Sequence, residues 1–417
     1  MGTWKTCKIL DLGEVVGGAT PSTKNPENYD GGSIAWITPK DLSNFTGRYI
    51  SHGERYITQK GLKSCSTRLM PAHSVLFSSR APIGYVAIAA NEICTNQGFK
   101  SVIPNDNTNY LFLYYLLKYN RNNIENMGSG TTFKEVSGST MKNISVRVPE
   151  SYEEQKRIGL FLGAIDDKIE ENEQINKNLE EQAVLLFRSM FTQTDSFSDN
   201  QLIESDFGCI PSTYKVVKAG DLPLLITDYV ANGSFASLKE NVTLYQEKNY
   251  AYFIRNTDLK ADSFGVFVDK HSYDFLAKST LYGGEIIISN VGDVGSVFLC
   301  PILDRPMTLG NNMIMLRSQQ PELQYFLYVW FKWSYGQGLI QGIKGGSAQP
   351  KFNKTDFRNL PIMLPPESVL HEYHTAVSPM FSMIANNKSE NSRLIGIRDS
   401  ILPKLMSGEL DVSNVDL

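Results

Sequence analysis

The sequence predicts an α+β fold in which two mixed α/β domains are separated by two long helices that form an antiparallel coiled coil. Three observations support this prediction: an internal repeat, a shared order of segments in both copies, and heptad spacing in the segment that ends each copy. The chain has 417 residues, of which 41% are apolar and 20% are charged. This composition is typical of globular proteins, and the length allows two to three domains.

The internal repeat relates the two halves of the chain as a pseudo-twofold duplication. Residues 37–42 recur at 254–259 with isoleucine, aspartate and leucine in the same places. Three further pairs keep nearly the same offset: 77–84 with 288–295, 112–118 with 326–332, and 141–149 with 357–365. Matches that keep one register through so much of the chain indicate two copies of a unit of about 210 residues.

Each copy has the same order of predicted elements. A strand-rich module comes first, with β-branched runs separated by Gly, Pro and Asn. The runs lie at 75–77, 85–89 and 285–289; then follow an aromatic-rich helix (110–119 or 323–333), a Gly/Ser loop (128–130 or 345–347), and a short strand ending at Pro149 or Pro365.

A long helix closes each copy. In the first helix, ten residues from Ile158 through Leu186 to Met190 keep a 4,3,4,3 spacing, which is typical of a coiled-coil seam. The second keeps it less strictly, from Val377 through Ile395 to Leu405. We expect the helices to pair with each other rather than only pack on their own modules. The expected pairing residues are Ile165, Ile169, Asn172, Asn176, Leu179, Phe381, Ile384 and Asn391.

The seam contains asparagines, and the repeat with its closing helices predicts the domain boundaries. Asparagine in a seam costs stability but fixes the register, because a misaligned partner leaves its amide unsatisfied. The expected segments are 1–149 for the first domain, 150–192 for the central helix, 193–365 for the second domain and 366–417 for the distal helix.

Charge is distributed unevenly along the chain. The net charge is −4, but residues 1–149 carry 16 basic against 10 acidic side chains, or +6, and residues 150–192 carry 5 against 10, or −5. A local positive field permits a polyanionic partner. The five cysteines include no C-x-x-C pair, and the longest apolar run, Tyr110–Leu117, is too short to span a bilayer. We expect a cytoplasmic protein with reduced thiols and no zinc site.

Common catalytic motifs are missing from the sequence. Neither G-x-G-x-x-G nor G-x-x-x-x-G-K-[ST] is present, and His371–His374 is one residue short of the H-E-x-x-H zinc motif. The Leu-Pro-Pro-Glu at 364–367 lacks the polar and aromatic residues of amino-methyltransferase motifs. Asp166-Asp167-Lys168 is interpreted as a solvated helix face rather than as part of a nuclease carboxylate cluster. We therefore expect no catalytic residue, metal or cofactor in this chain.

Several stretches resemble the conserved regions of type I restriction-modification specificity subunits. Residues 163–176, with 186–191, are similar to the central conserved region of that family, and 394–410 to its distal conserved region. Residues 77–84 and 95–99 resemble patches of its target-recognition domains. The resemblance covers essentially the whole chain. In the second copy Asn290-Val291 replaces Ser79-Arg80 and Asn311 replaces Gln97, so the two copies are expected to make different contacts.

The resemblance implies a DNA-reading subunit without catalytic activity of its own. Each recognition domain would read one half of a bipartite, asymmetric site in double-stranded DNA, and the helices would set the spacer between the halves. The implied partners are two methyltransferase subunits, which bring S-adenosylmethionine and methylate adenine N6, in a complex that can recruit motor-nuclease subunits. Because the target base leaves the stack for methylation, the recognition domains need only position the duplex.

Candidate DNA contacts follow from side-chain chemistry. Arg and Lys pair with guanine and Asn and Gln with adenine, whereas Lys, Arg, Ser and Thr contact phosphates. We expect about half of the following loop and strand-end residues to touch DNA: Lys40, Ser78, Ser79, Arg80, Gln97 and Lys134 in the first domain, and Arg255, Asn256, Asn290, Asn311, Asn312, Lys344 and Lys351 in the second.

Three other functions stay open at this point. The same domains would serve a system in which one partner chain carries both methyltransferase and nuclease activities. A two-domain DNA-binding regulator without methyltransferase partners is less favoured, because the acidic, regularly patterned helices indicate a docking surface for large partners. A self-sufficient enzyme is disfavoured by the missing motifs.

Overall fold

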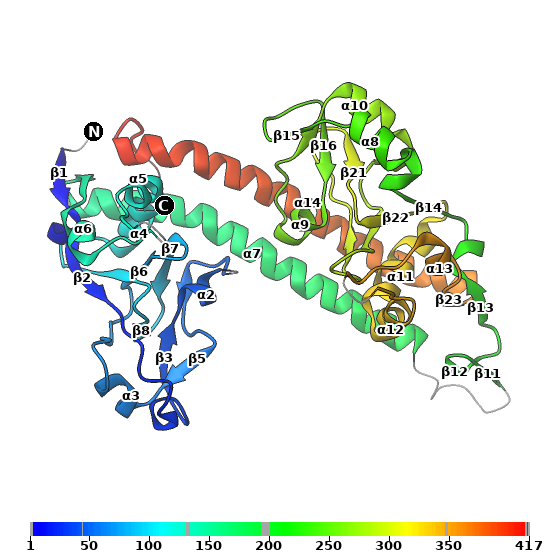
Figure 1. Ribbon diagram of the computed structural model, residues 1–417, viewed down its shortest axis with the longest axis horizontal. Helices are drawn as coiled ribbons and strands as arrows, with labels where there is room; N and C mark the ends of the chain where they lie inside the picture. The colour runs from blue at the N-terminus through cyan, green and yellow to red at the C-terminus, as the bar shows by residue number, and fades with distance from the viewer. Residues whose placement is uncertain are drawn as a thin grey trace. The chain divides into compact units, whose positions relative to one another are not determined.

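The computed structural model describes residues 3–43, 45–130, 134–192, 201–346, 349–412 and 415. The chain forms two compact units, of which unit 1 consists of Met1–Glu171 and Asn391–Leu417, and unit 2 of Asn172–Glu390. Helices α7 (Tyr152–Phe191) and α14 (Glu367–Ser407) each contribute one part to each unit (Figure 1). The sequence interpretation set each long helix apart as its own segment, 150–192 and 366–417, whereas the compact units divide each helix between them.

Unit 1 is built around a five-stranded sheet in the order β2-β9-β6-β7-β4, with a three-stranded sheet β5-β3-β8 and a two-stranded sheet β1-β10. Helix α4 covers β6 and β7. The elements are β1 (Trp4–Lys8), α1 (Ile9–Leu12), β2 (Gly13–Gly17), η1 (Pro26–Asn28), β3 (Ile34–Ile37), α2 (Pro39–Leu42), β4 (Tyr49–Ile50), β5 (Arg55–Ile57), α3 (Gln59–Lys63), β6 (Val75–Ser79), β7 (Ile83–Ala89), β8 (Cys94–Thr95), β9 (Lys100–Pro104), α4 (Tyr110–Tyr119), α5 (Arg121–Asn126), α6 (Gly138–Asn143) and β10 (Ser145–Pro149).

Unit 2 contains a four-stranded sheet β14-β22-β19-β20, a five-stranded sheet β15-β17-β16-β21-β18 and two-stranded sheets β11-β12 and β13-β23. The elements are β11 (Leu202–Ser205), β12 (Gly208–Pro211), β13 (Lys215–Lys218), η3 (Ala219–Asp221), β14 (Leu224–Asp228), η4 (Tyr229–Asn232), α8 (Phe235–Asn241), β15 (Leu244–Tyr245), β16 (Ala251–Ile254), α9 (Asn256–Ala261), β17 (Phe267–Val268), α10 (Lys270–Phe275), η5 (Ala277–Ser279), β18 (Thr280–Leu281), β19 (Ile286–Ser289), β20 (Val297–Leu299), β21 (Met307–Leu309), β22 (Met313–Ser318), α11 (Pro321–Lys332), α12 (Ser334–Gly342), α13 (Lys354–Arg358) and β23 (Pro361–Leu364).

The two units repeat one strand topology. The order β2-β9-β6-β7 of unit 1 returns as β14-β22-β19-β20 in unit 2. Strand β3 pairs in parallel with β8 and antiparallel with β5, and β16 does the same with β21 and β17. The register agrees as well. Val16 pairs with Ser101 in unit 1, and the residues at the equivalent positions of the repeat, Thr227 and Met315, pair with each other in unit 2. The repeat in the sequence is therefore a repeat of structure, and the predicted fold class is confirmed.

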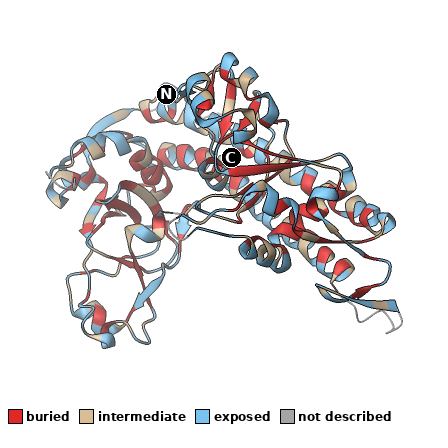
Figure 2. Ribbon diagram, turned by 45° about the vertical axis from the view of Figure 1, so that its right-hand side comes forward, coloured by how far each residue is buried: buried red, intermediate tan, exposed pale blue. Residues whose placement is uncertain are grey.

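Both long helices enter the core of each unit. In unit 1, Ile158 of α7 and Leu405 of α14 belong to the cluster that includes α4. In unit 2, Phe187 of α7 and Tyr373 of α14 belong to the cluster that includes α11. Figure 2 shows the buried residues, drawn in red, on the strands and on the helices that cover them. Each helix thus packs on the sheet-containing part of each unit.

Within each unit, α7 and α14 run antiparallel. In unit 1, Asn391 Nδ2 donates to the carbonyl of Ile169 at 3.3 Å. In unit 2, Asn172 Nδ2 donates to Glu390 Oε2 at 2.8 Å and Asn387 Nδ2 donates to Asn176 Oδ1 at 2.9 Å. These side chains satisfy the amides of the seam asparagines across the helix pair, which is the condition under which a polar seam residue fixes register.

The buried stripe departs from a strict heptad towards the helix ends. Phe187 and Phe191 are buried, whereas Leu186 and Met190 are only partly buried. Ile395 is 39% exposed. An α-helix has 3.6 residues per turn, so a heptad pattern drifts by about 20° per repeat and the buried position moves to a neighbouring residue. Of the expected pairing residues, Ile169, Asn172, Phe381 and Asn391 are buried and Ile165, Asn176, Leu179 and Ile384 are partly buried.

The interpretation of Asp166-Asp167-Lys168 as a solvated face is wrong for Asp166. Its carboxylate accepts hydrogen bonds from the Tyr115 hydroxyl at 2.6 Å and from Arg398 Nη1 at 2.7 Å. Asp167 is exposed but pairs with Arg48, whose own side chain is only 4% exposed. The helical surface pattern missed this because the partners come from distant parts of the chain, and a buried carboxylate requires such partners.

Candidate nucleic-acid interface

One end of the five-stranded sheet gathers three of the candidates in unit 1. Ser79 N donates to the carbonyl of Gly98 at 2.7 Å, which holds the end of β6 against the turn before β9. Arg80 forms a β-bridge with Glu135, whose backbone also pairs with Ser129. Arg80, Gln97 and Lys134 therefore lie near one another on neighbouring segments, and the latter two side chains are exposed.

Ser78 and Ser79 are corrections to the expected set, because both are fully buried. Ser78 Oγ donates to the carbonyl of Pro82 and accepts from Tyr85 N, both at 2.8 Å. Ser79 Oγ donates to the carbonyl of Gly98 at 3.2 Å. These hydroxyls hold the β6–β7 connection, and neither is presented to a ligand.

Ion pairs restrain the cations of unit 1. Arg80 Nη1 lies 3.8 Å from Glu135 Oε2, and Lys100 Nζ lies 3.4 Å from Glu135 Oε1. The Arg80 side chain is 35% exposed, so it retains a free edge. Lys40 lies in α2 and pairs with Glu54 at 2.8 Å. This hydrogen bond raises the pKa of the Lys40 ammonium. Gln97 accepts a hydrogen bond from the Thr20 hydroxyl.

The equivalent sheet end of unit 2 gathers a different set. Asn290 N donates to the carbonyl of Asn312 at 3.0 Å, which matches the Ser79–Gly98 contact of unit 1. Val291 and Gly345 both form β-bridges with Lys351, as Arg80 and Ser129 do with Glu135. Asn290, Asn311, Asn312 and Lys351 are therefore neighbours, with valine at the arginine position and lysine at the glutamate position.

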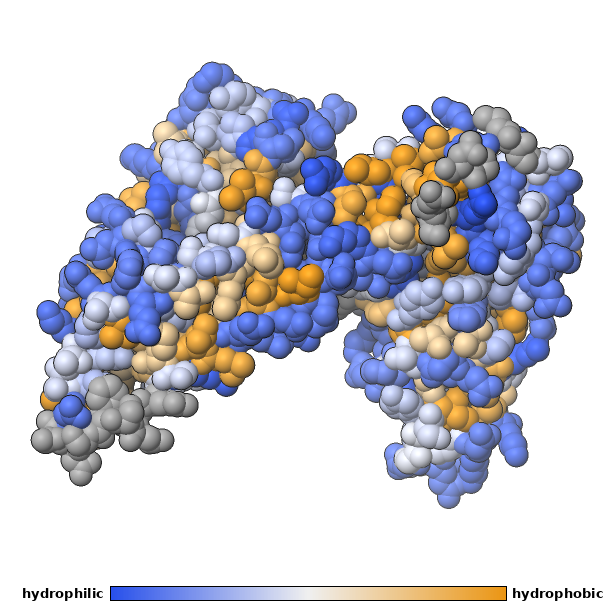
Figure 3. All heavy atoms as spheres, turned by 180° about the vertical axis from the view of Figure 1, so that it is seen from behind, coloured by the Kyte–Doolittle hydropathy of each residue, from blue (hydrophilic) through white to orange (hydrophobic). Residues whose placement is uncertain are grey.

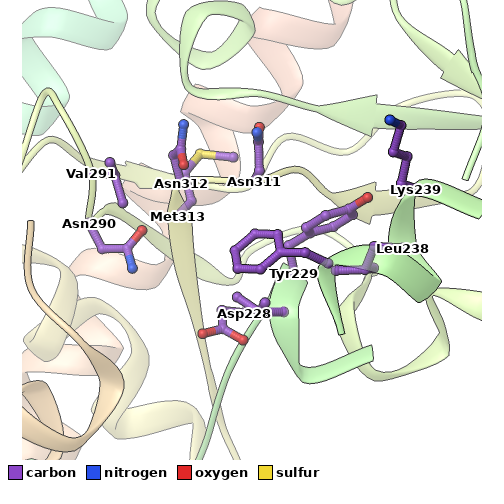
Figure 4. Close-up of a pocket in the computed structure, with 11 residues that line it drawn as sticks. Asp228, Tyr229, Leu238, Lys239, Asn290, Val291, Asn311, Asn312 and Met313 are labelled. Atoms are coloured by element: carbon purple, nitrogen blue, oxygen red, sulfur yellow. The ribbon is translucent and has the colours of Figure 1, made fainter. Parts of the chain in front are cut away.

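A pocket of about 330 Å³ opens at this end of unit 2. Figure 4 shows Asn290 and Val291 on one side of it and Tyr229, Leu238 and Lys239 on the other, with Asn311, Asn312 and Met313 between them. Asp228 at its base pairs with Lys354 at 2.9 Å, which compensates the carboxylate charge. Burial raises the pKa of the Tyr229 hydroxyl, so this ring is a neutral part of the wall.

The remaining candidates of unit 2 are held by neighbouring side chains. Arg255 Nη2 and Nε donate to Asp258 at 2.6 and 2.9 Å, and these hydrogen bonds raise the pKa of the guanidinium. Asn256 Nδ2 donates to Asp293 Oδ2 at 3.4 Å. Lys344 Nζ donates to the Gln341 amide oxygen at 3.3 Å. Arg255 stands at the N-cap of α9, where the Asp258 carboxylate also accepts from its backbone N–H at 3.0 Å, a role that the sequence interpretation did not include.

Three residues at these sheet ends were absent from the expected set. Glu135 restrains Arg80, Phe235 is 80% exposed beside the pocket, and Lys239 lies at the pocket edge. The repeat offset that pairs 141–149 with 357–365 also pairs Glu135 with Lys351. The sequence therefore carried a signal for Glu135. Phe235 and Lys239 lie in α8, for which the repeat offers no counterpart in unit 1.

Apolar surface, metal ligands and membrane-spanning helices are three further features that would indicate a function outside the sheet ends. The hydrophobic side chains of the face drawn in Figure 3 are interrupted by hydrophilic ones. Across the described residues, no three His, Cys, Asp or Glu side chains come together as metal ligands. No helix in that part of the chain combines the length and apolarity that a membrane crossing needs.

The fold and these two sheet ends define a class: a duplicated α+β recognition protein whose units share a pair of antiparallel helices. The chain belongs to the family described as "Type I restriction modification DNA specificity domain", whose family model matches residues 1–181 and 211–394. It is 37% identical to the type I restriction enzyme MjaIX specificity subunit of Methanocaldococcus jannaschii, over 99% of this chain and 94% of that protein.

Two further likenesses agree with this assignment. The EcoR124I/EcoR124II specificity subunit of Escherichia coli is 30% identical over 39% of this chain and 40% of its own length. The crystal structure of the type I restriction-modification S subunit from M. genitalium superposes with a TM-score of 0.57 at 18% identity, and it covers 97% of this chain and 96% of that one. The fold is therefore that of a specificity subunit along the whole chain.

Proposed function

We propose that this chain reads a bipartite DNA site, with unit 1 recognising one half and unit 2 the other. The observation that carries the proposal is the pair of equivalent sheet ends, which have the same backbone contacts but different side chains. Recognition of two unlike half-sites requires the same backbone arrangement in both units with different side chains on it, because base edges are distinguished by their donor and acceptor patterns. The asymmetry of the site then follows from the asymmetry of Arg80 against Val291 and Glu135 against Lys351.

The partners in this proposal are double-stranded DNA and two methyltransferase subunits, with motor-nuclease subunits as a further addition. Both long helices expose apolar side chains although they are otherwise polar: Leu160 and Ile397 in unit 1, and Leu185 and Met383 in unit 2. Apolar residues on an exposed, mainly acidic helix surface favour docking of a protein partner. S-adenosylmethionine would be held by the methyltransferase, and this chain would position the duplex.

The helices also supply the spacer in this proposal. Because α7 and α14 each enter the cores of both units, their length between those cores is the part of the chain that can set a distance between the two reading surfaces. The side-chain contacts that fix their register, such as Asn172 with Glu390, make that length reproducible.

The proposal is tested by expressing the chain with and without the methyltransferase gene that neighbours it and by sequencing methylated adenines. The expected result is methylation at one bipartite sequence only when both proteins are present, and no binding of S-adenosylmethionine by the isolated chain in calorimetry. Methylation at sites that do not depend on this chain, or cofactor binding by the chain alone, would overturn the proposal.

A further inference from the structure

The pocket of unit 2 has a structural counterpart in unit 1 that is filled. The shared register makes Gly17 and Gly18 equivalent to Asp228 and Tyr229. A Cβ at Gly18 would lie 2.1 Å from the carbonyl oxygen of Asn96, so the chain of unit 1 runs directly against that turn. In unit 2 the chain turns away after Asp228 into η4 and α8, and the pocket occupies the space that is left.

The walls of the pocket combine amides with apolar groups. Asn311 and Asn312 are exposed, and the buried Asn290 Oδ1 accepts no hydrogen bond from any residue that the structure describes. Val230, Val291 and Phe235 supply apolar surface next to them, and Phe235 is 80% exposed. Asn290 Nδ2 donates to the carbonyl of Phe352 at 3.4 Å, so the amides open to a ligand are those of Asn311 and Asn312. A large exposed aromatic such as Phe235 is unfavourable in the free protein and would be covered by a ligand that offers an apolar group.

The side chains of the pocket favour an amide-read base edge over two alternative ligands, a phosphate and guanine. A phosphate would need several cations, but the Asp228 carboxylate is paired with Lys354 and Lys239 is the cation among the lining residues. Guanine is read mainly by arginine or lysine; the position of Arg80 in unit 1 is held here by Val291, and Lys239 is the one such side chain among lining residues that include Asn311 and Asn312. Asparagine side chains pair with adenine N6 and N7, and apolar side chains contact the thymine methyl group.

We propose that this pocket reads the major-groove edge of an adenine–thymine pair in the half-site of unit 2. The exposed amides of Asn311 and Asn312 bind adenine N6 and N7, and the apolar side chains of Phe235 and Val291, from opposite sides of the pocket, receive the thymine methyl. The inference rests on the proposed function, since it names what one of the two reading surfaces recognises. It also explains why unit 2 differs from unit 1 at every one of these equivalent positions.

Substitutions that copy unit 1 provide the matched variants. Asn312 has a φ of +65°, a conformation that glycine adopts freely, and its equivalent in unit 1 is Gly98. Asn312→Gly therefore removes the amide without straining the backbone, and Asn311→Ala removes the neighbouring exposed amide. Lys248→Ala, an exposed position of unit 2 outside the pocket, serves as the control.

The test uses the complex of this chain with its methyltransferase subunits and a duplex carrying the sequence found by methylation mapping. The half-site that Arg80→Ala leaves unchanged is assigned to unit 2. Each thymine in it is replaced singly by uracil, which lacks the methyl group, and each adenine that is not methylated by 7-deazaadenine, which lacks N7. We expect one pair at which both replacements lower the methylation rate, by roughly 5- to 150-fold for the loss of the amide contact.

The variants decide whether the pocket is responsible. Asn311→Ala and Asn312→Gly should slow methylation of the natural duplex and lose the sensitivity to 7-deazaadenine at that pair, while Lys248→Ala retains both rate and sensitivity. If the variants fold, as judged by their urea midpoints, and keep the wild-type rate and sensitivity, the inference is overturned while the proposed function stands. If the wild-type complex methylates no specific sequence, the proposed function fails and the inference fails with it.

Discussion

Asp166 Oδ1 lies 2.7 Å from Arg398 Nη1, so the first long helix and the second are joined in unit 1 by an ion pair whose side chains are 7% and 18% exposed. The Tyr115 hydroxyl donates to the other carboxylate oxygen, which brings α4 into the same cluster. Burial and the Asp166 carboxylate raise the pKa of Tyr115. The recognition module and both helices of unit 1 are therefore connected through one carboxylate.

Replacing Asp166 by alanine is expected to destabilise unit 1 strongly. The change leaves the Arg398 guanidinium and the Tyr115 hydroxyl without their acceptor, and breaking a buried ion pair on one side costs about 3 to 5 kcal/mol. Urea unfolding followed by fluorescence measures the loss. Lys168 lies two residues from Asp166 and pairs with Glu171 on the surface, so Lys168→Ala should cost under about 1 kcal/mol. Equal losses in the two variants would contradict the role given to Asp166.

Glu135 is expected to control how well unit 1 discriminates between sequences. Glu135→Gln frees Arg80 and Lys100 from their ion pairs and removes one negative charge. Binding to random duplex should become tighter and its salt dependence steeper by about 0.9 in the logarithmic slope, while the preference for the target falls. Fluorescence anisotropy across a salt series measures both quantities.

The matched control for Glu135 is Glu54→Gln, which removes the same charge from the exposed pair with Lys40. This variant should leave the preference for the target unchanged, because it frees no side chain at the sheet end. If both variants show the same preference as the wild type, Glu135 does not position Arg80.

Glu180 should make the stability of unit 2 depend on pH. Burial opposes its ionisation, but Lys332 Nζ and the Tyr328 hydroxyl, both 2.6 Å from Oε1, lower the pKa of the carboxyl. A lowered carboxyl pKa stabilises the fold above the unfolded value of about 4.3, and this contribution is lost as pH falls through the folded value. The stability difference between wild type and Glu180→Gln should therefore be constant near neutral pH and shrink under acid conditions.

Urea midpoints read from tryptophan fluorescence at several pH values check this expectation, since Trp330 and Trp333 lie in unit 2. Glu181→Gln, at the exposed neighbouring position, is the control and should show little difference from wild type at any pH. A difference for Glu180→Gln that grows as pH falls would have the opposite sign to the one derived from the contacts.

Inserting one heptad into each long helix at matching levels is expected to lengthen the spacer of the DNA site. Seven residues add about 10 Å of helix, which corresponds to about 3 base pairs. Both half-sites should stay the same, although about 100° of added DNA rotation lowers activity unless the duplex twists. Methylation mapping of the double insertion decides the point: a wild-type spacer with retained activity would mean that the helices are not the ruler.

The fold could be predicted from the sequence where a pattern repeats. The offset between the halves located the equivalent modules, and the apolar spacing located both long helices. The errors in the predicted fold came from contacts between residues that are distant in the sequence. Strict heptad spacing placed Leu186 and Met190 in the seam, whereas packing against the aromatic core of unit 2 buries Phe187 and Phe191. Asp166 looked like a surface residue because Arg398 is 232 residues away.

The candidate site was predicted only in part, because contacts that the sequence does not show decide which side chains face solvent. Side-chain chemistry and loop position selected Arg80, Asn290, Asn311 and Asn312, which the structure gathers at equivalent sheet ends. The same criteria selected Ser78 and Ser79, whose hydroxyls are consumed by backbone contacts. Whether a serine faces solvent or its own turn depends on the local hydrogen bonds, which composition does not reveal. The pocket itself depends on α8, an insertion that only the folded chain relates to Asn290.

The division of the chain between the units has a consequence for the order in which they form during synthesis. Unit 2 is one continuous segment, Asn172–Glu390, whereas unit 1 combines residues before it with Asn391–Leu417 after it. Leu405 and Met406 lie in the core of unit 1, and Arg147 Nη1 donates to the carbonyl of Ser407 at 3.0 Å. Unit 1 therefore starts before unit 2 in the chain and is completed after it, so its core gains Leu405 and Met406 only once all of unit 2 has been synthesised.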